Sequence, residues 1–227
     1  MLVNVLRSAC PLIALCIVAF AAAKLSAADI VLPKPNLKGT MSIEEGLARR
    51  RSVRQYATGS LTLDQVSQLL WACQGVTNKE GYRAAPSAGA TFPIEMYLVV
   101  GDVEGVEPGL YHYDILDHAL WRTKKEDIRK ALDVACLNQH MIADAPATLV
   151  ITGILQRTAQ RYGSRAARYV FMEAGHIGQN IYLQCEPLGL ATCAIGAFRD
   201  DEVAKVLGLK TEEPLYIFPV GRKPGEK

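Results

Sequence analysis

Four arginines lie within six positions of this 227-residue chain, at Arg49, Arg50, Arg51 and Arg54. A guanidinium group presents a planar fork of N–H donors that matches two oxygens of a phosphate or a carboxylate. Guanidinium groups this close also repel one another, so an anion among them would stabilise the arrangement. These four residues, the arginine cluster, therefore predict an anion site. The plainer interpretation is a solvated basic face of a helix.

The first 28 residues are typical of a secretory signal peptide. Arg7 supplies a positive start, residues 9–23 form an apolar run, and Ser26-Ala27-Ala28 provides the small residues that a signal peptidase reads. We expect cleavage near Ala28 and an exported protein, periplasmic or secreted. The alternative is an uncleaved membrane anchor, but the apolar run is shorter than the ~20 residues that cross a bilayer, and it contains Pro11.

The charge balance of the mature chain makes the arginine cluster a local feature. Removing residues 1–28 removes Arg7 and Lys24 but no acidic residue, which leaves 23 basic and 23 acidic side chains. A neutral domain does not favour broad nucleic-acid binding, because such binding depends on counterion release by a net positive surface. We therefore expect a small anion, no nucleic-acid partner and, after signal removal, no membrane contact.

Four cysteines remain in the mature chain: Cys73, Cys136, Cys185 and Cys193. Their spacing matches no CxxC pair and no Cys/His ligand set, so the sequence predicts no metal site. One disulfide is compatible with an oxidising compartment. Cysteines within apolar segments are typical of buried free thiols, and this is the state that we expect.

Two capping boxes locate the helices nearest to the arginine cluster. Ser42 with Glu45 begins the helix that carries the arginines, and Thr62 with Gln65 begins the next one. Glycine, proline and serine then predict a loop at residues 75–93. Further along, periodicity predicts strands at 94–100, 110–113, 119–122, 147–152, 193–195 and 215–220, and helices at 125–138, 164–188 and between Asp200 and Gly208.

Together these elements form one domain over residues 41–227, preceded by an extended lead-in at residues 29–40. The helix at 164–188 contains Gly175 and Gly178, each of which costs about 1 kcal/mol relative to alanine. We expect a close approach there, by a second helix across a homodimer interface or by a flat ligand. For His176, between them, we expect a buried, hydrogen-bonded place in an interface rather than a catalytic role.

Several ordered segments resemble the nitroreductase superfamily, and some resemble its SagB-type dehydrogenase branch. The resemblance extends from about residue 41 to residue 222. The family-like segments are Arg50-Arg51-Ser52-Val53-Arg54, Arg83 to Gly89 leading into Pro93-Ile94-Glu95-Met96-Tyr97, Gly189 to Phe198, and Pro219 to Arg222. The SagB-like segments are Ala85 to Ala90, Gly109 to Tyr113, and Glu173 to Asn180.

This resemblance implies an α+β fold with a mainly antiparallel central sheet flanked by helices, and with a long central helix at a homodimer interface. It also implies FMN as cofactor and an oxidoreductase that transfers two electrons or a hydride between the flavin N5 and a small-molecule substrate. NAD(P)H is a candidate electron donor. An FMN-dependent oxidase or dehydrogenase of the azoline-oxidising type, and a non-catalytic flavin-binding module, are the alternatives.

The resemblance further assigns residues to the flavin. Arg50 and Arg54 match positions near the FMN phosphate and ribityl chain, and Arg222 matches a late basic position near the phosphate. Arg51 and Ser52 match positions near the pyrimidine end of the ring. A positive group there would stabilise the anionic reduced flavin.

Two segments of small residues complete the implied site. Pro86, Ser87, Ala88 and Gly89 would approach the flavin from the partner subunit, where small side chains let the backbone contact a flat ring. Gly196 and Ala197 match the segment at N5. Many relatives have a glutamate at the position of Gly196, so no acidic residue is expected here, and the resemblance identifies no catalytic residue. After Lys227 we expect no long C-terminal arm.

Overall fold

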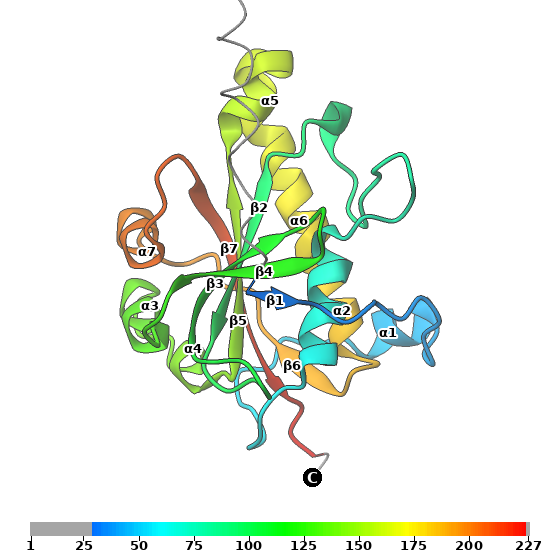
Figure 1. Cartoon of the computed structure of the whole chain (residues 1–227), viewed down its shortest axis with the longest axis vertical. Coiled ribbons are helices and arrows are strands. Elements are labelled where there is room, and N and C mark those ends of the chain that lie inside the picture. Colours follow the sequence, from blue (N-terminus) through cyan, green and yellow to red (C-terminus); the bar gives the residue numbers. More distant parts are fainter. Residues whose placement is uncertain (1–28, 226–227) are drawn as a thin grey trace, which may run out of the picture.

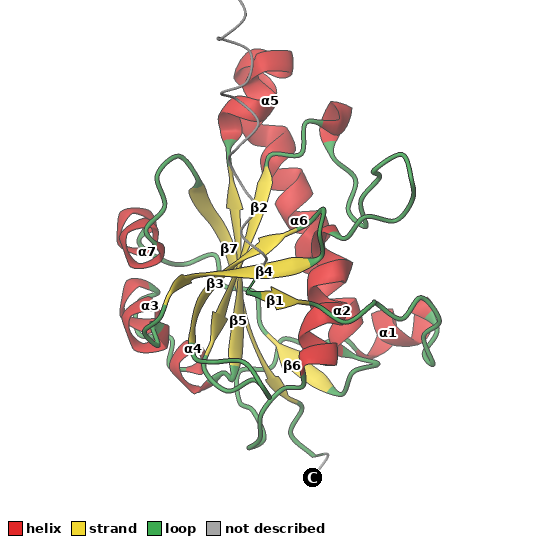
Figure 2. Cartoon of the chain, in the orientation of Figure 1, coloured by secondary structure: helices red, strands yellow, loops and turns green. Residues whose placement is uncertain are grey.

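An antiparallel sheet of seven strands forms the centre of the molecule, in the order β1-β4-β3-β2-β5-β7-β6 (Figures 1 and 2). The computed structural model describes residues 29–225, so the expected signal peptide and its cleavage site lie outside the described residues. The strands are β1 Ile30–Val31, β2 Ile94–Val100, β3 Gly109–Asp114, β4 Ala119–Lys124, β5 Ala147–Gly153, β6 Leu190–Thr192 and β7 Glu213–Arg222.

Helices cover both faces of this sheet. Figure 1 shows α2 and α6 on one side and α3, α4 and α7 on the other. The helices are α1 Ile43–Arg49, α2 Leu63–Gln74, α3 Arg129–Ala135, α4 Met141–Asp144, α5 Leu155–Tyr162, α6 Ala166–Cys185 and α7 Asp200–Leu207, with 3-10 turns at Ala88–Ala90 and Gly163–Arg165. None of them, within residues 29–225, is long and apolar enough to cross a membrane.

The alternation of side chains along β2 shows how one strand supports two cores. Met96 and Leu98 belong to the core under α2 and α6, whereas Tyr97 and Val99 belong to the core under α3 and α7. Successive side chains of a strand point to opposite faces, so a central strand covered on both faces is mostly apolar. The expected α+β fold with an antiparallel sheet between helices is confirmed.

Local signals located several elements correctly. The Ser42 hydroxyl accepts the N–H of Glu45 at 3.1 Å, and Thr62 and Gln65 form a complete capping box. The strand at residues 94–100 and the hairpin of β3 and β4 lie where they were expected. These elements depend on neighbouring residues, which explains why the sequence locates them.

Other expectations were wrong in position or extent. The helix expected at 125–138 is shorter: α3 begins at Arg129 and ends at Ala135, and Leu137 and Asn138 beyond it adopt left-handed φ angles of 63° and 57°. The short strand expected at 193–195 is β6 at 190–192, where it pairs with β7. The sequence did not predict α5. The lead-in also contributes more than expected, since β1 pairs with β4 and Leu32 is buried.

The two glycines of α6 have different surroundings. A Cβ at Gly178 would lie 2.7 Å from the Phe218 ring, so a side chain of β7 makes the close approach there. The expectation of a partner helix or flat ligand at Gly178 is therefore wrong. Gly175 has open space around its backbone. His176 is exposed in the described chain, so it is not buried by its own subunit.

The four cysteines are free and buried, which confirms the expected thiols. Burial raises the pKa of the Cys136 thiol to about 12, so this group is protonated and unreactive at neutral pH. Within the described residues, no group of three or more His, Cys, Asp or Glu side chains could hold a metal ion.

Candidate functional site

Tyr182 of α6 connects the arginine cluster to the segment that contains Gly196. The Arg50 guanidinium lies over the Tyr182 ring, 5.1 Å from its centroid, and the Ser52 hydroxyl lies 2.8 Å from the Tyr182 hydroxyl. The same Tyr182 oxygen accepts the backbone N–H of Ala194 at 2.8 Å. One side chain therefore fixes two segments that are far apart in the sequence.

Backbone pairing brings a third segment to the same place. Ser52 forms a bridge with Thr192, the last residue of β6, and the Val53 N–H donates to the Thr192 carbonyl at 2.9 Å. Arg222, at the end of β7, pairs with β6, and its carbonyl accepts the Ala57 N–H at 3.0 Å. Thus the structure brings together three of the four family-like segments.

The members of the arginine cluster have different partners. Arg49 pairs with Glu45 at 2.5 Å on the surface, which is the plain solvated arrangement. Arg51 donates to the carbonyls of Ala48 and Arg50 at 3.0 and 2.8 Å, so its guanidinium satisfies the end of α1. Within residues 29–225 no carboxylate forms an ion pair with Arg50. Arg50 therefore remains available to an anion.

Arg54 and Arg222 both lie beside Gly59. Arg54 lines a cavity of about 410 Å³ together with Gly59, and with Asp102 and Asp144 on its walls. The Arg222 side chain packs against Gly59, and its Nε donates to the Ser60 carbonyl at 3.1 Å. The carboxylates offset part of the positive charge in this cavity. The cluster is thus divided between the Tyr182 contact and this cavity.

Gly196 and Ala197 form an exposed backbone segment. Ile195, just before them, pairs with Ile217 of β7, and the Gln139 amide donates to the Ala197 carbonyl at 2.8 Å. In the described chain the N–H groups of Gly196 and Ala197 have no acceptor. A Cβ added at Gly196 would touch only the Tyr216 ring, at 3.7 Å. This segment therefore offers free amides on an open surface.

Pro86, Ser87, Ala88 and Gly89 lie elsewhere. The Gly89 carbonyl accepts a hydrogen bond from Arg161 of α5 at 3.0 Å, and Ser87 lies beside the buried Glu173 of α6. Glu173 and Tyr182 are nine residues apart on one helix, or roughly 14 Å at 1.5 Å per residue. The fourth family-like segment is therefore separated from the other three within one subunit.

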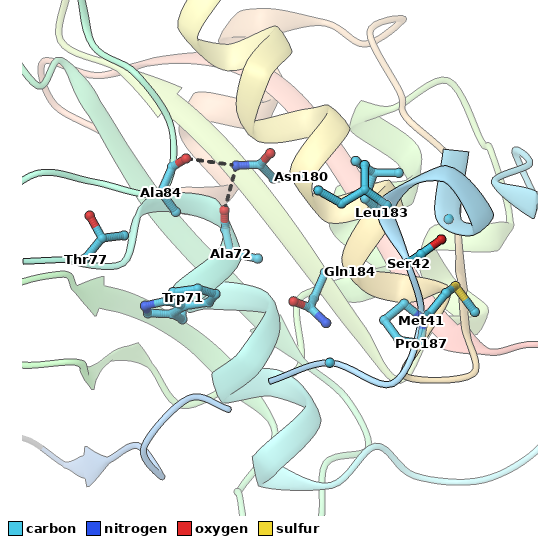
Figure 3. Close-up of a pocket in the computed structure, with 13 residues that line it drawn as sticks. Met41, Ser42, Trp71, Ala72, Thr77, Ala84, Asn180, Leu183, Gln184 and Pro187 are labelled. Atoms are coloured by element: carbon cyan, nitrogen blue, oxygen red, sulfur yellow. Dashed lines mark hydrogen bonds between the residues drawn. The ribbon is translucent and has the colours of Figure 1, made fainter. Parts of the chain in front are cut away.

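A further pocket, which the sequence did not predict, lies between α1, α2 and α6 (Figure 3). Its volume of about 430 Å³ suits a small molecule, and its walls include the apolar side chains of Met41, Trp71 and Leu183. Asn180 donates to the carbonyls of Ala72 at 2.9 Å and Ala84 at 3.5 Å, as Figure 3 shows. The pocket adjoins the start of α1, whereas the arginine cluster is at its end.

The model of the nitroreductase family matches residues 47–222. The chain belongs to the nitroreductase family. Members of this family are generally flavin-dependent oxidoreductases. The expected family is confirmed, and the relatives that this chain matches include SagB-type proteins. A nitroreductase of Methanocaldococcus jannaschii is 46% identical over 183 residues, which cover 81% of this chain and 92% of that protein.

Two further nitroreductase-family proteins extend the comparison. The crystal structure of a nitroreductase from Ralstonia eutropha is 29% identical, with a TM-score of 0.76, and the match covers 87% of this chain and 90% of that one. The trifolitoxin-processing protein TfxB of Rhizobium leguminosarum is 32% identical over 156 residues, or 62% of this chain. This chain spans only 39% of the length of TfxB.

Sequence reasoning missed Tyr182 as the connection within the site. Its position on α6 was expected to be helical, but no motif links a tyrosine of this helix to Ser52 or to Ala194. The hydroxyl reaches both because β6 and the segment after α1 lie side by side, and this arrangement depends on the sheet.

Proposed function

We propose that this protein is an exported FMN-dependent oxidoreductase that transfers two electrons or a hydride to or from a small-molecule substrate. The observation that carries the proposal is the double contact of Tyr182. The Arg50 guanidinium, which forms no ion pair within residues 29–225, lies over its ring, and its hydroxyl holds Ala194, two residues before the exposed amide of Gly196. Arg50 supplies the cation, and Gly196 and Ala197 supply the amides. An anionic cofactor with a flat ring fits such a combination.

The arginines would hold the phosphate end of the cofactor. A phosphate is close to dianionic at neutral pH, and charge-assisted hydrogen bonds from guanidinium groups offset the loss of its hydration. Arg50 has the freedom to do this. Arg54 lines the neighbouring cavity, and the Arg222 side chain packs against Gly59 of its wall. Arg51 and Ser52 would face the pyrimidine end, with Ser52 oriented by Tyr182.

When bound, FMN supplies an N5 atom that accepts or gives a hydride. Gly196 and Ala197 would orient the ring through their N–H groups, and the Tyr182 bond to Ala194 would keep this backbone in place. Because the segment presents amides rather than a carboxylate, it binds and orients but transfers no proton. NAD(P)H is the electron donor that we propose.

A homodimer would complete the site. Phe171 and Met172 on α6 are 55% and 52% exposed, and Gly175 and His176 extend this face by one helical turn. An apolar stripe of this kind is typical of an interface. A partner packed on it would bury His176. It would also bring the Pro86–Gly89 segment of each subunit towards the Tyr182 region of the other.

An absorbance spectrum of the purified protein tests the cofactor. We expect flavin bands in near-stoichiometric amount, or their recovery after FMN is added and excess removed. Protein that stays colourless after this treatment would refute FMN binding. Mass spectrometry of protein expressed in bacteria tests export, since cleavage near Ala28 predicts a mature chain that begins at about residue 29.

A second candidate function is an FMN-dependent oxidase or dehydrogenase of the azoline-oxidising type. The similarity to a trifolitoxin-processing protein favours it, and the scarcity of reduced nicotinamide outside the cytosol is compatible with it. Anaerobic mixing with NADPH separates the two candidates. Rapid bleaching of the flavin band supports a reductase, whereas bleaching by an azoline-containing peptide, followed by recovery in oxygen, supports the second candidate.

A further inference from the structure

The loop between α2 and β2 has a strained backbone at residues 84–92. Gly89, Ala90 and Phe92 have positive φ angles of 58°, 52° and 43°. The left-handed region is unfavourable for alanine and phenylalanine, because their Cβ crowds the following carbonyl oxygen. Such a conformation persists only where the neighbouring structure holds it.

From the outside, two arginines of α5 hold this loop. Arg161 donates to the Gly89 carbonyl and Arg157 to the Phe92 carbonyl, both at 3.0 Å. Arg157 is itself held by an ion pair with Glu95 of β2 at 2.6 Å. The outer contacts therefore link the loop to both a helix and the sheet.

On the inside, the loop rests on Glu173, a carboxyl that is only 1% exposed. The Gln74 amide donates to Glu173 Oε1 at 3.1 Å, while Oε2 is buried and has no hydrogen-bond partner within residues 29–225. Ser87 is the adjacent hydroxyl. Because the Ser87 oxygen accepts the Phe92 N–H at 3.0 Å, its own hydrogen is free to point at this carboxyl.

We propose that Glu173 is a positioning residue for the flavin of the partner subunit. It orients the Ser87 hydroxyl, which fixes the Phe92 N–H and with it the strained turn of the Pro86–Gly89 segment. Because Glu173 is buried, it acts through the shape of this segment. The inference rests on the proposed function, since it assumes that FMN binds between two subunits.

The variant Glu173→Gln tests the role of this carboxyl. It keeps the volume and an acceptor for Gln74 but puts an N–H donor where Ser87 needs an acceptor. We expect the dissociation constant for FMN to rise about ten-fold, the effect of one good hydrogen bond, and the midpoint potential of the flavin to shift. The matched control is Asp133→Asn on α3, another buried carboxyl with an unpaired oxygen, which lies under the opposite face of the sheet.

A double mutant decides whether Glu173 acts through Ser87. In a Ser87→Ala background, Glu173→Gln is expected to cause no further loss of FMN affinity. Equal losses in both backgrounds would assign Glu173 to the general stability of α6 and overturn the inference. If Glu173→Gln does not fold, Glu173→Asp replaces it, because the shorter carboxylate also fails to reach Ser87.

Mixed dimers of Arg50→Ala and Glu173→Gln subunits test the action across the interface. If the loop serves the partner, one of the two sites has both wild-type parts, and half of the flavin binds with wild-type affinity. If the loop serves its own subunit, each site carries one defect and neither binds normally, which overturns the inference. Wild-type protein without any FMN would refute the proposed function as well, whereas normal binding by Glu173→Gln refutes this inference alone.

Discussion

The substitution Tyr182→Phe removes one oxygen from the centre of the candidate site. It deletes the acceptor of the Ala194 N–H and the partner of the Ser52 hydroxyl, each at 2.8 Å. The aromatic ring remains, so the stacking of Arg50 and the edge-on packing against Phe218 are retained. The change therefore isolates the two hydrogen bonds from the packing.

The two lost bonds determine the expected size of the effect. A hydrogen bond contributes about 0.5–1.5 kcal/mol net, so the free energy of unfolding is expected to fall by about 1–3 kcal/mol. For a chain of this size, 1 kcal/mol corresponds to about 2–4 °C, which predicts a decrease in Tm of about 2–12 °C. FMN affinity falls as well, because Ser52 and the Gly196 segment are both released.

Thermal unfolding and FMN titration of the apoprotein measure the two effects. Tyr169→Phe is the matched control, because Tyr169 is on the same helix and its hydroxyl has no hydrogen-bond partner within residues 29–225. We expect Tyr169→Phe to behave as wild type. If Tyr182→Phe has the same Tm and the same FMN affinity as this control, Tyr182 does not connect the site.

The remaining predictions concern the cluster, the interface and pH. Arg50→Ala and Arg54→Ala are each expected to weaken FMN binding by about 1.5–3 kcal/mol, the range for a hydrogen bond to a charged group. Arg49→Ala removes only a surface ion pair, so we expect it to leave FMN binding unchanged. Equal FMN affinity in wild type and Arg54→Ala would exclude Arg54 as a phosphate ligand. Phe171→Glu places a charge on the exposed face of α6 and is expected to yield monomers in light scattering, while a dimer of unchanged strength would locate the interface elsewhere. Burial raises the pKa of the Glu173 carboxyl, although Ser87 and Gln74 act to lower it. The contribution of Glu173 to stability is therefore complete below the unfolded pKa of about 4.3, and it is lost as pH rises through the folded pKa. The Tm of wild type is therefore expected to fall relative to that of Glu173→Gln as pH rises from the unfolded to the folded pKa. Parallel curves of Tm against pH for the two proteins would contradict a raised pKa.

Signals carried by neighbouring residues were sufficient for part of the fold. The capping residues of α1 and α2 and the apolar run of β2 specify their elements without any distant contact. By contrast, α5 buries only Thr158 among its eight residues, so it has almost no apolar pattern to detect. The position of β6 is set by pairing with β7, which the local sequence does not encode.

The candidate site shows the same division. Family-like segments identified Arg50, Ser52 and Gly196, but their separation from Pro86 to Gly89 along α6 follows from the three-dimensional structure. The different partners of Arg49, Arg51 and Arg54 likewise depend on where α1 ends. Because a guanidinium side chain is long and flexible, its position in the sequence does not specify its partner.

The lengths of the outermost strands limit how two copies of this protein can associate. The sheet ends in β1, with two residues, and in β6, with three, and the outer side of β6 is already paired with Ser52 and Val53. Short and covered edges oppose the addition of further strands, including those of amyloid-like aggregates. Within residues 29–225 the sheet therefore offers no long free strand edge through which two subunits could form one continuous sheet. We expect two copies to associate through the exposed helical surface instead.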